Sequence, residues 1–452
     1  MILHHLMARN LFLISLLILS LVFKSCTAHS WRNYSSLDDV GPRCEPSSHP
    51  FGLCKTRAAA FGYPCEDHMV TTEDGYILSL KRIPHGVSKS TKNRTRIPVL
   101  LFHGLMVDSV SWVLGTPKQS LGFILADGGF DVWFANTRGT NSSRNHTSLT
   151  PDDPEYWNWT WDQLAAYDLP AVLQFVYDHT GGQKVHYIGH SLGTLIIIAA
   201  FSEHRLLHLV RSAVLLCPIA YLYKTKSKLT RLATQILLAE VKENCSSYFF
   251  LLSTTTSIIY MVNGLFSLVC LAQAFHFLGY REFNPVGPVS HEILLLICGD
   301  PEVDCYNLFT AVMGPDCCLN ASTVCAFLQH ATQSTSIKNL IHMSQMIRYE
   351  GVRRYDYGNA LENMKHYNQP RPPLYDLSSI PTHIPMFLTH GGQDFLGDVP
   401  DTRHLLKTLV RTHDSNNMEV LYLPDYAHAD FVIGYNAPQL VYGPIVDFLQ
   451  RH

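Results

Sequence analysis

Short apolar runs bounded by turn residues recur along the chain, and longer stretches with helical periodicity lie between them. Runs of this length predict buried strands, and strands that alternate with helices predict a mostly parallel sheet covered on both faces. The clearest predicted helices span residues 160–179 and 437–450. The predicted strands span residues 97–102, 130–135, 184–188, 212–216, 384–389 and 418–423. The pattern therefore predicts an α/β fold.

The alternation of strands and helices is lost between residues 221 and 346, which hold seven of the cysteines. Within this part, residues 244–280 contain no Asp, Glu, Lys or Arg. We interpret residues 221–346 as an inserted, mainly helical cap or lid domain. It would divide the α/β core into an N-terminal part, residues 29–220, and a C-terminal part, residues 347–452.

The uncharged segment 244–280 is long enough to cross a bilayer, but polar residues 253–257, Asn263 and Gly264 interrupt it. A crossing here would also separate the two halves of the predicted sheet. We expect instead a lid that closes over a pocket in water and opens against lipid, because a large exposed apolar surface is a liability in water. Membrane contact would then be peripheral rather than integral.

Composition limits the function classes. Hydrophobic residues make up 47% of the chain and charged residues 16%, which excludes bulk disorder. The formal net charge is −3 and no long Lys/Arg run occurs, so no nucleic-acid partner is expected. The 24 histidines gain charge below about pH 6, which is compatible with an acidic compartment.

The N-terminal segment has the pattern of a signal peptide, residues 1–28. Arg9 precedes an apolar stretch, residues 11–23, and a small-residue site ends at Ala28. A membrane anchor would need about 20 apolar residues. We expect entry into the secretory pathway, with the protein either extracellular or in a vacuole or lysosome. Seven candidate N-glycosylation sequons support this route. They are Asn33, Asn93, Asn141, Asn145, Asn158, Asn244 and Asn320.

Eleven of the 12 cysteines follow residue 28, and in an oxidising compartment they predict several disulfides whose pairing stays open. Because eleven is odd, at least one thiol should remain free. Cys217 ends an apolar run and is predicted to be an inert buried thiol. Zinc is the competing interpretation, but the chain has no paired Cys-x-x-Cys motif and no His-Glu-x-x-His motif, so no metal is expected.

A Gly-His-Ser-Leu-Gly motif, residues 189–193, directly follows the predicted strand 184–188 and precedes a helix of small and apolar residues. This is the context of a nucleophile elbow, in which a sharp turn exposes a serine hydroxyl and the flanking glycines permit close backbone packing. The motif predicts Ser191 as the nucleophile.

A serine nucleophile needs a general base and an acid that orients the base. Asp394 lies in a loop after the predicted strand 384–389, and His428 follows the last predicted strand. Their order after Ser191 is the serine, acid, histidine order of elbow hydrolases. Asp398 remains the alternative acid, and His390 the alternative base.

The developing oxyanion needs two backbone N–H donors. One is expected from Leu192, directly after the nucleophile. The other is expected from Leu105, in the loop after the predicted strand 97–102, although His103 and Gly104 there could form only a turn.

These motifs together resemble the acid lipase family, which includes gastric lipase, lysosomal acid lipase and secreted plant triacylglycerol lipases. Gly-Tyr-Pro-Cys-Glu at 62–66, Val-Thr-Thr-Glu-Asp-Gly-Tyr-Ile-Leu at 70–78 and Asn-Thr-Arg-Gly at 136–139 are similar to the family's N-terminal signature. The sequence departs from the animal members at Leu192, where they have glutamine, and in its cysteine-rich cap.

The resemblance implies an α/β-hydrolase fold and an enzyme that cleaves neutral lipid esters, such as triacylglycerols or sterol esters, at a lipid–water interface. Hydrolysis would pass through an acyl-enzyme on Ser191 and require no cofactor. Alternatives are a hydrolase-fold receptor with little or no turnover, and an acyltransferase or thioesterase. The oligomeric state stays open.

Overall fold

The computed structural model describes residues 52–87, 96–238, 281–284, 308–330, 332–410 and 417–452. The predicted signal peptide, the predicted lid segment 244–280 and the sequons at Asn33, Asn93 and Asn244 lie outside these residues. Among the described residues, no helix is long and apolar enough to cross a membrane.

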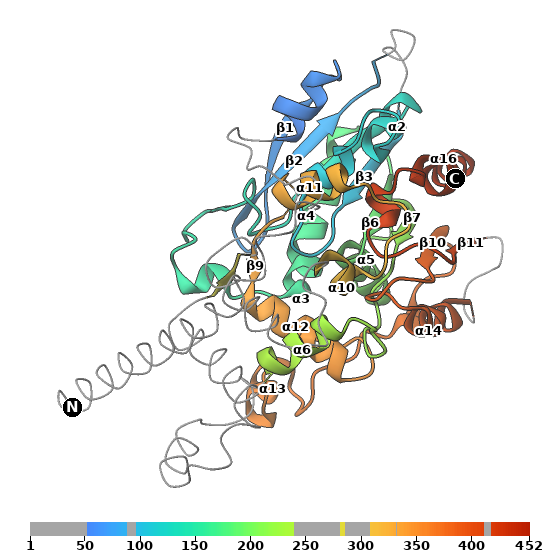
Figure 1. Cartoon of the computed structure of the whole chain (residues 1–452). Helices are drawn as coiled ribbons and strands as arrows, with labels where there is room; N and C mark the ends of the chain where they lie inside the picture. The colour runs from blue at the N-terminus through green and yellow to red at the C-terminus, as the bar shows by residue number, and fades with distance from the viewer. Residues whose placement is uncertain (1–51, 88–95, 239–280, 285–307, 331, 411–416) are drawn as a thin grey trace, which may run out of the picture. The chain divides into compact units, whose positions relative to one another are not determined.

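A central sheet carries the fold, in the order β1-β2-β4-β3-β6-β7-β10-β11, with the short β5 paired to β2 (Figure 1). The six strands from β4 to β11 pair in parallel, whereas β1, β2 and β5 pair antiparallel. These six parallel strands match the predicted ones to within two residues at each end, which confirms the mostly parallel sheet. The bounds are β1 Glu66–Thr71, β2 Tyr76–Ile83, β3 Pro98–Phe102, β4 Asp131–Ala135, β5 Asn145–His146, β6 Val185–His190, β7 Val210–Leu216, β10 Met386–Gly391 and β11 Met418–Leu423.

The hairpin β1–β2 was not among the predicted strands. β1 lies at the sheet edge, where its residues alternate between half-buried and exposed, so it lacks the continuous apolar run of a central strand. Its turn requires Gly75, which has φ of +96° and whose Cβ position would lie 2.6 Å from Thr147 Oγ1.

Helices cover both faces of the sheet, as predicted. Successive strand residues enter two separate apolar clusters, with Leu100 in one and Leu101 in the other. The first cluster includes residues of α4 (Leu169–His179), α5 (Leu192–Ser202) and α14 (Val399–Val410). The second includes residues of α2 (Leu121–Asp127) and α16 (Gly443–Arg451).

The predicted helix 160–179 is present but contains a wide turn. It consists of α3 (Trp161–Gln163), the π-helical turn η6 (Leu164–Asp168) and α4. Thr160 and Gln163 form a capping box at its start. Pro170 cannot donate to the carbonyl of Ala166, which instead accepts a hydrogen bond from the Arg205 guanidinium at 2.8 Å. The predicted helix 437–450 likewise begins with a π-helical turn, η10 (Pro438–Tyr442), before α16.

Most of the described residues in the predicted cap, 221–346, are helical, in line with the prediction of a mainly helical insertion. Its described helices are α6 (Lys228–Leu238), α10 (Leu308–Met313), α11 (Ala321–His330) and α12 (Ile337–Arg348), and α13 (Ala360–Tyr367) follows them in the chain (Figure 1). A two-stranded sheet joins β8 (Glu282–Phe283) to β9 (Thr335–Ser336). The boundaries of a cap at residues 221 and 346 stay a prediction.

The described cysteines include both bonded and free residues. Cys54 is bonded to Cys65, which ties the turn η2 (Leu53–Ala58) to the start of β1, and the adjacent Cys317 and Cys318 are bonded to each other. Cys217 is free and buried, which confirms its prediction as a core thiol. The described sequon asparagines are all exposed, namely Asn141, Asn145, Asn158 and Asn320.

Candidate active site

The predicted turn between β6 and α5 is present. Ser191 occupies it with φ of 53° and ψ of −116°, a conformation that a side chain adopts only under strain. A Cβ on Gly189 would lie 2.8 Å from the Gly193 carbonyl carbon, and a Cβ on Gly193 would lie 2.5 Å from the Phe102 oxygen. Both glycines are therefore required for the tight approach of α5 to β6 and β3. The Ser191 N–H donates to Leu216 at 3.0 Å, which ties the turn to the end of β7.

Asp394 and His428 meet at the carboxyl edge of the same sheet. Asp394 follows β10 and His428 follows β11, and the His428 Nδ1 lies 2.8 Å from the Asp394 Oδ2. The other oxygen of Asp394 accepts the N–H groups of Leu396 and Gly397 at 2.8 and 2.9 Å. Burial alone would raise the pKa of Asp394, but His428 and these hydrogen bonds hold that pKa below its ordinary value. The carboxylate therefore stays charged and oriented toward the imidazole.

The backbone of His428 is held by two hydrogen bonds, which position its side chain. The backbone N–H of His428 donates to the Met313 carbonyl at 3.1 Å, and the backbone carbonyl of His428 accepts from the His190 Nε2 at 3.2 Å. The His190 and His428 rings lie 4.9 Å apart, which brings the base loop beside the neighbour of Ser191. The His428 Nε2 is buried and has no hydrogen-bond partner among the described residues. The hydrogen bond to the Ser191 hydroxyl is therefore not formed in this state, as is common when no substrate is bound.

The two alternative residues have other contacts. Asp398 accepts the N–H of Asp401 at 3.0 Å in the first turn of α14, and burial raises its pKa to about 6. His390 lies within β10, and its ring packs 4.7 Å from Tyr422 of β11. Neither arrangement is that of an acid or base facing Ser191, so the geometry favours Asp394 and His428.

The loop after β3 lies against the proposed nucleophile. A Cβ on Gly104 would lie 3.1 Å from the Ser191 Cβ. The buried His103 accepts the Thr137 N–H at Nε2, over 3.1 Å, so its Nδ1 carries the proton and donates to the Gly104 carbonyl at 2.8 Å. That carbonyl and the Leu105 N–H belong to one planar peptide unit, so His103 fixes the direction of the expected oxyanion donor. The Leu192 N–H lies in the first turn of α5, where helical N–H groups have no partner within the helix.

His103 is the residue whose role the sequence did not show. Burial lowers the pKa of its imidazole to about 4, so the ring stays neutral and keeps this hydrogen-bond pattern in mildly acidic solution. The signal that could have identified it is the Asn-Thr-Arg-Gly motif, which begins directly after β4, the neighbour of β3 in the sheet.

The residues of this motif support the same loop. Thr137 donates to His103, and the Asn136 side chain accepts the Ser109 N–H at 3.0 Å. The fully buried Arg138 forms ion pairs of 2.6 Å with both Asp74 and Asp168. The motif thus connects the loop after β3 to the β1–β2 turn, through Asp74, and to the π-helical turn η6, through Asp168.

One cluster beside the proposed site has the residue types of a metal site. Atoms of His190, Cys217 and His428 lie within 4.8 Å of one another. However, the His428 Nδ1 is already bonded to Asp394, and burial raises the pKa of the Cys217 thiol well above its ordinary value. Metal ions bind the thiolate, so this cluster is a poor fit to a metal.

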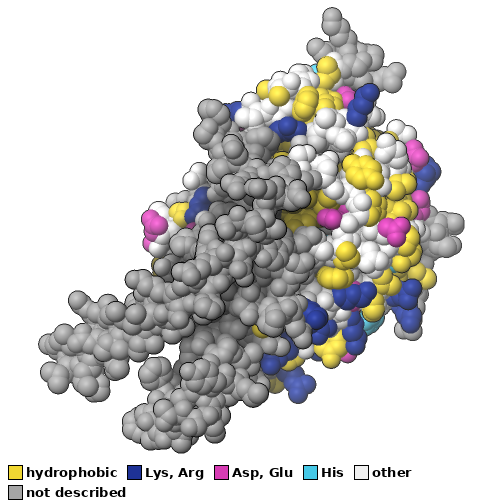
Figure 2. Space-filling view, viewed as in Figure 1, with side chains coloured by type: hydrophobic (Ala, Val, Ile, Leu, Met, Phe, Trp, Pro, Cys, Tyr) yellow, Lys and Arg dark blue, Asp and Glu magenta, His cyan; other side chains and the backbone are white. Residues whose placement is uncertain are grey.

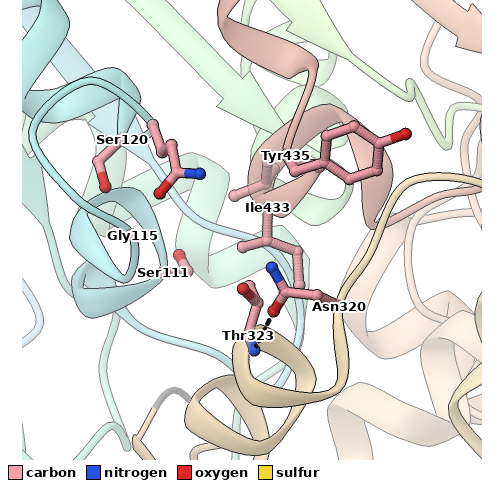
Figure 3. Close-up of a pocket in the computed structure, with 10 residues that line it drawn as sticks. Ser111, Gly115, Ser120, Asn320, Thr323, Ile433 and Tyr435 are labelled. Atoms are coloured by element: carbon pink, nitrogen blue, oxygen red, sulfur yellow. Dashed lines mark hydrogen bonds between the residues drawn. The ribbon is translucent and has the colours of Figure 1, made fainter.

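Figure 3 shows a small pocket next to the 3₁₀ turn η4 (Ser109–Val113). Ser111, Ser120, Asn320, Thr323 and Tyr435 are among its lining residues, and none of the proposed catalytic residues is. An acyl chain needs a mainly apolar wall, which these hydroxyl and amide groups do not provide. The sequon residue Asn320 also lies at this pocket, and its Oδ1 accepts the Thr323 N–H at 2.8 Å.

A parallel sheet with a serine elbow and an acid–histidine pair at its carboxyl edge defines the α/β-hydrolase class. In agreement, the family model for the alpha/beta hydrolase fold matches residues 97–244, and that for a partial alpha/beta-hydrolase lipase region matches residues 54–116. A soluble variant of the Saccharomyces cerevisiae monoglyceride lipase superposes with a TM-score of 0.50 at 14% identity, over 89% of this chain and 97% of that one. The solved structure supports the fold alone.

Sequence comparison narrows the class to a family. The chain is 43% identical to triacylglycerol lipase 2 of Arabidopsis thaliana over 402 residues, which cover 88% of each chain. It is 34% identical to the gastric triacylglycerol lipase of Bos taurus, over 86% of this chain and 89% of the relative. It is 33% identical to the human lysosomal acid lipase/cholesteryl ester hydrolase, over 87% and 89%. The chain belongs to the acid lipase family and is a carboxylic ester hydrolase.

Proposed function

We propose that the protein hydrolyses neutral lipid esters, such as triacylglycerols or sterol esters, through an acyl-enzyme on Ser191. The observation that carries this proposal is the buried hydrogen bond between His428 and Asp394 beside the strained Ser191 turn. The substrate class is supported by the names of the relatives, which act on triacylglycerols and cholesteryl esters.

The proposed reaction uses the residues as follows. The Ser191 hydroxyl attacks the ester carbonyl while His428 takes its proton at Nε2, and Asp394 stabilises the resulting imidazolium. The N–H groups of Leu105 and Leu192 bind the tetrahedral oxyanion. His428 then returns the proton to the leaving alcohol, which departs as a diacylglycerol or a sterol. Water then attacks the acyl-enzyme carbonyl while His428 takes its proton, and His428 returns that proton to the Ser191 Oγ as the bond to serine breaks and the fatty acid leaves.

The proposed site of action is a lipid–water interface in the secretory pathway, with contact that is peripheral to the membrane. The exposed sequons and the disulfide between Cys54 and Cys65 support an oxidising, glycosylating route. The choice between an extracellular and a vacuolar or lysosomal location belongs to the same proposal.

Product analysis tests the substrate class. The purified protein and its Ser191→Ala variant are incubated with emulsified triolein, cholesteryl oleate and a dissolved short-chain ester, and released fatty acid is measured. We expect release from triolein and from the short ester by the wild type, and none above background by the variant. Hydrolysis of the short ester without hydrolysis of either lipid would replace the lipase proposal with a small-ester esterase.

A further inference from the structure

An exposed row of lysines follows β7. Lys224, Lys226 and Lys228 are exposed, whereas the intervening Thr225 and Ser227 are fully buried. Lys224 ends a turn, and α6 (Lys228–Leu238) begins at Lys228. The three lysine side chains are therefore accessible to solvent just before and at the start of α6, with the Lys224 Nζ 4.7 Å from the centre of the Tyr223 ring.

A second cationic row lies on α14. Arg403 and Lys407 are exposed and four residues apart, so they share one helix face, and together with His404 they line a hollow in the surface. The two rows adjoin, because the Lys224 N–H donates to the Asp401 side chain at 2.7 Å and the Tyr221 ring stacks on His404 at 4.3 Å.

Together the two rows form one basic surface, which we define as Lys224, Lys226, Lys228, Arg231, Arg403 and Lys407. Figure 2 shows Lys and Arg side chains gathered on the lower part of the displayed face, in the region of α6 and α14. Such a gathering is a local asymmetry, because the whole chain has a formal net charge of −3.

Four of the six cations of the basic surface, Lys224, Lys226, Arg403 and Lys407, are in no ion pair among the described residues. Among the described residues, Asp398 lies within electrostatic range of Lys226 and Asp401 of Lys224, but both acids are buried and accept backbone N–H groups. The exposed face is therefore cationic.

The basic surface is attached directly to the loop of the proposed catalytic acid. The Lys226 N–H donates to the Phe395 carbonyl at 3.0 Å, and the Thr225 hydroxyl donates to the same oxygen. Phe395 follows Asp394, so the backbone at Lys226 lies at the carboxyl edge of the sheet, where the Ser191 turn also lies, and α14 begins at the same edge. A flat surface bound to these cations would therefore lie close to the carboxyl edge of the sheet.

We propose that the basic surface binds an anionic lipid–water interface and so brings the carboxyl edge of the sheet to the lipid. The chemistry recognised is a layer of phosphate head groups, with which Lys and Arg side chains pair at short range. This inference rests on the proposed lipase function, because it names the interface at which the same site works. A membrane surface fits better than a single small anion, because the cations are spread along an extended segment and a helix face.

Vesicle binding without turnover tests the inference. The Ser191→Ala protein is floated with vesicles of phosphatidylcholine alone, or of phosphatidylcholine mixed with phosphatidylglycerol. We expect binding to the mixed vesicles only, and weaker binding at high salt, because screening shortens the reach of surface charges. Lys224→Gln with Lys226→Gln, and Arg403→Gln with Lys407→Gln, should each lower the partition coefficient roughly 30-fold, and the four changes together roughly 1,000-fold.

A matched control removes two cations from the opposite edge of the sheet. Lys184 lies just before β6 and Arg211 is the second residue of β7, and both are exposed at the amino ends of these parallel strands. Lys184→Gln with Arg211→Gln should leave the partition coefficient unchanged. Equal losses in the control and the test pairs, or equal wild-type binding to both kinds of vesicle, would overturn the inference. Displacement from the vesicles by millimolar inorganic phosphate would also overturn it, in favour of a small-anion site.

Failure of the lipase proposal remains distinguishable from failure of this inference. With Ser191 intact, the variant that carries all four substitutions should hydrolyse a dissolved short-chain ester at the wild-type rate. If the wild type itself does not hydrolyse that ester, the lipase proposal fails while the vesicle result still stands. A loss of ester hydrolysis in the variant alone would show that the cations serve the site directly, which contradicts their assignment to lipid binding.

Discussion

The Nδ1 atom of His103 lies 2.8 Å from the carbonyl oxygen of Gly104, and this hydrogen bond fixes the peptide unit that presents the Leu105 N–H. Removal of one oxyanion donor typically lowers kcat by about 10² to 10³. Since His103→Ala would leave the donor present but free to rotate, we expect a loss near the lower end of that range, about 10²-fold in kcat. KM for a dissolved ester should change little, because the ground-state ester does not depend on the oxyanion contact.

His186 offers a matched control for that variant. It is also a buried histidine, on β6, with its Nδ1 2.7 Å from the Ser212 hydroxyl. His186→Ala should lower the free energy of unfolding without lowering kcat. If both variants lose only stability, His103 has a structural role and does not position the donor.

The two aspartates after β10 should differ sharply. Asp394→Asn removes the charge that orients His428, and loss of this charge in a related triad lowers kcat by about 10⁴. Asp398→Asn keeps an oxygen that can accept the Asp401 N–H, so kcat should stay within a few-fold of the wild type. Steady-state kinetics on a short ester decides between them, and a reversed ranking would make Asp398 the acid.

The sequence could predict the central strands and the serine turn because both have local signals. A strand buried on both faces is a continuous apolar run, and a sharp strand-to-helix turn needs glycines at fixed positions, here Gly189 and Gly193. The edge strand β1 was missed because half of its residues face solvent.

Contacts between distant residues could not be predicted in this way. Asp394 and Asp398 lie in one loop, and only the folded backbone shows that Asp394 faces His428 while Asp398 supports the first turn of α14. The role of His103 depends on the Thr137 N–H, a contact across neighbouring strands with no local signal. The bond between Cys317 and Cys318 was likewise one of many open pairings.

The close approach at the serine turn predicts an intolerant position. A Cβ on Gly193 would lie 2.5 Å from the Phe102 oxygen, so Gly193→Ala must push α5 away from the loop that carries Leu105. We expect a loss of about 1–3 kcal/mol in the free energy of unfolding and a fall in kcat of at least 10-fold. Gly443→Ala is the control, because a Cβ there would have its nearest neighbour at 3.7 Å. Urea unfolding and ester kinetics measure both, and a Gly193→Ala variant as active as the control would contradict the geometry.

A buried carboxyl group near the base loop predicts a pH-dependent stability. Asp430 accepts the Ala427 N–H, and burial raises its pKa to about 6 from 3.8. The folded state therefore binds a proton more tightly than the unfolded state, so this group contributes stability that is present below about pH 4 and lost as the pH rises through 6. Asp430→Asn, which carries no charge at any pH, should gain stability relative to the wild type by about 2 kcal/mol between pH 4 and pH 7. Thermal unfolding of both proteins across this range checks the sign, and a constant difference would show that the group is not perturbed.

The central claim is that Ser191 is the nucleophile of a lipid ester hydrolase. Incubation with a fluorophosphonate, followed by mass spectrometry of the digested protein, tests it most directly. We predict one adduct, on Ser191, whose formation parallels the loss of triolein hydrolysis and is slowed strongly by His428→Ala. An adduct on another residue, or continued hydrolysis when Ser191 is fully modified, would contradict the account.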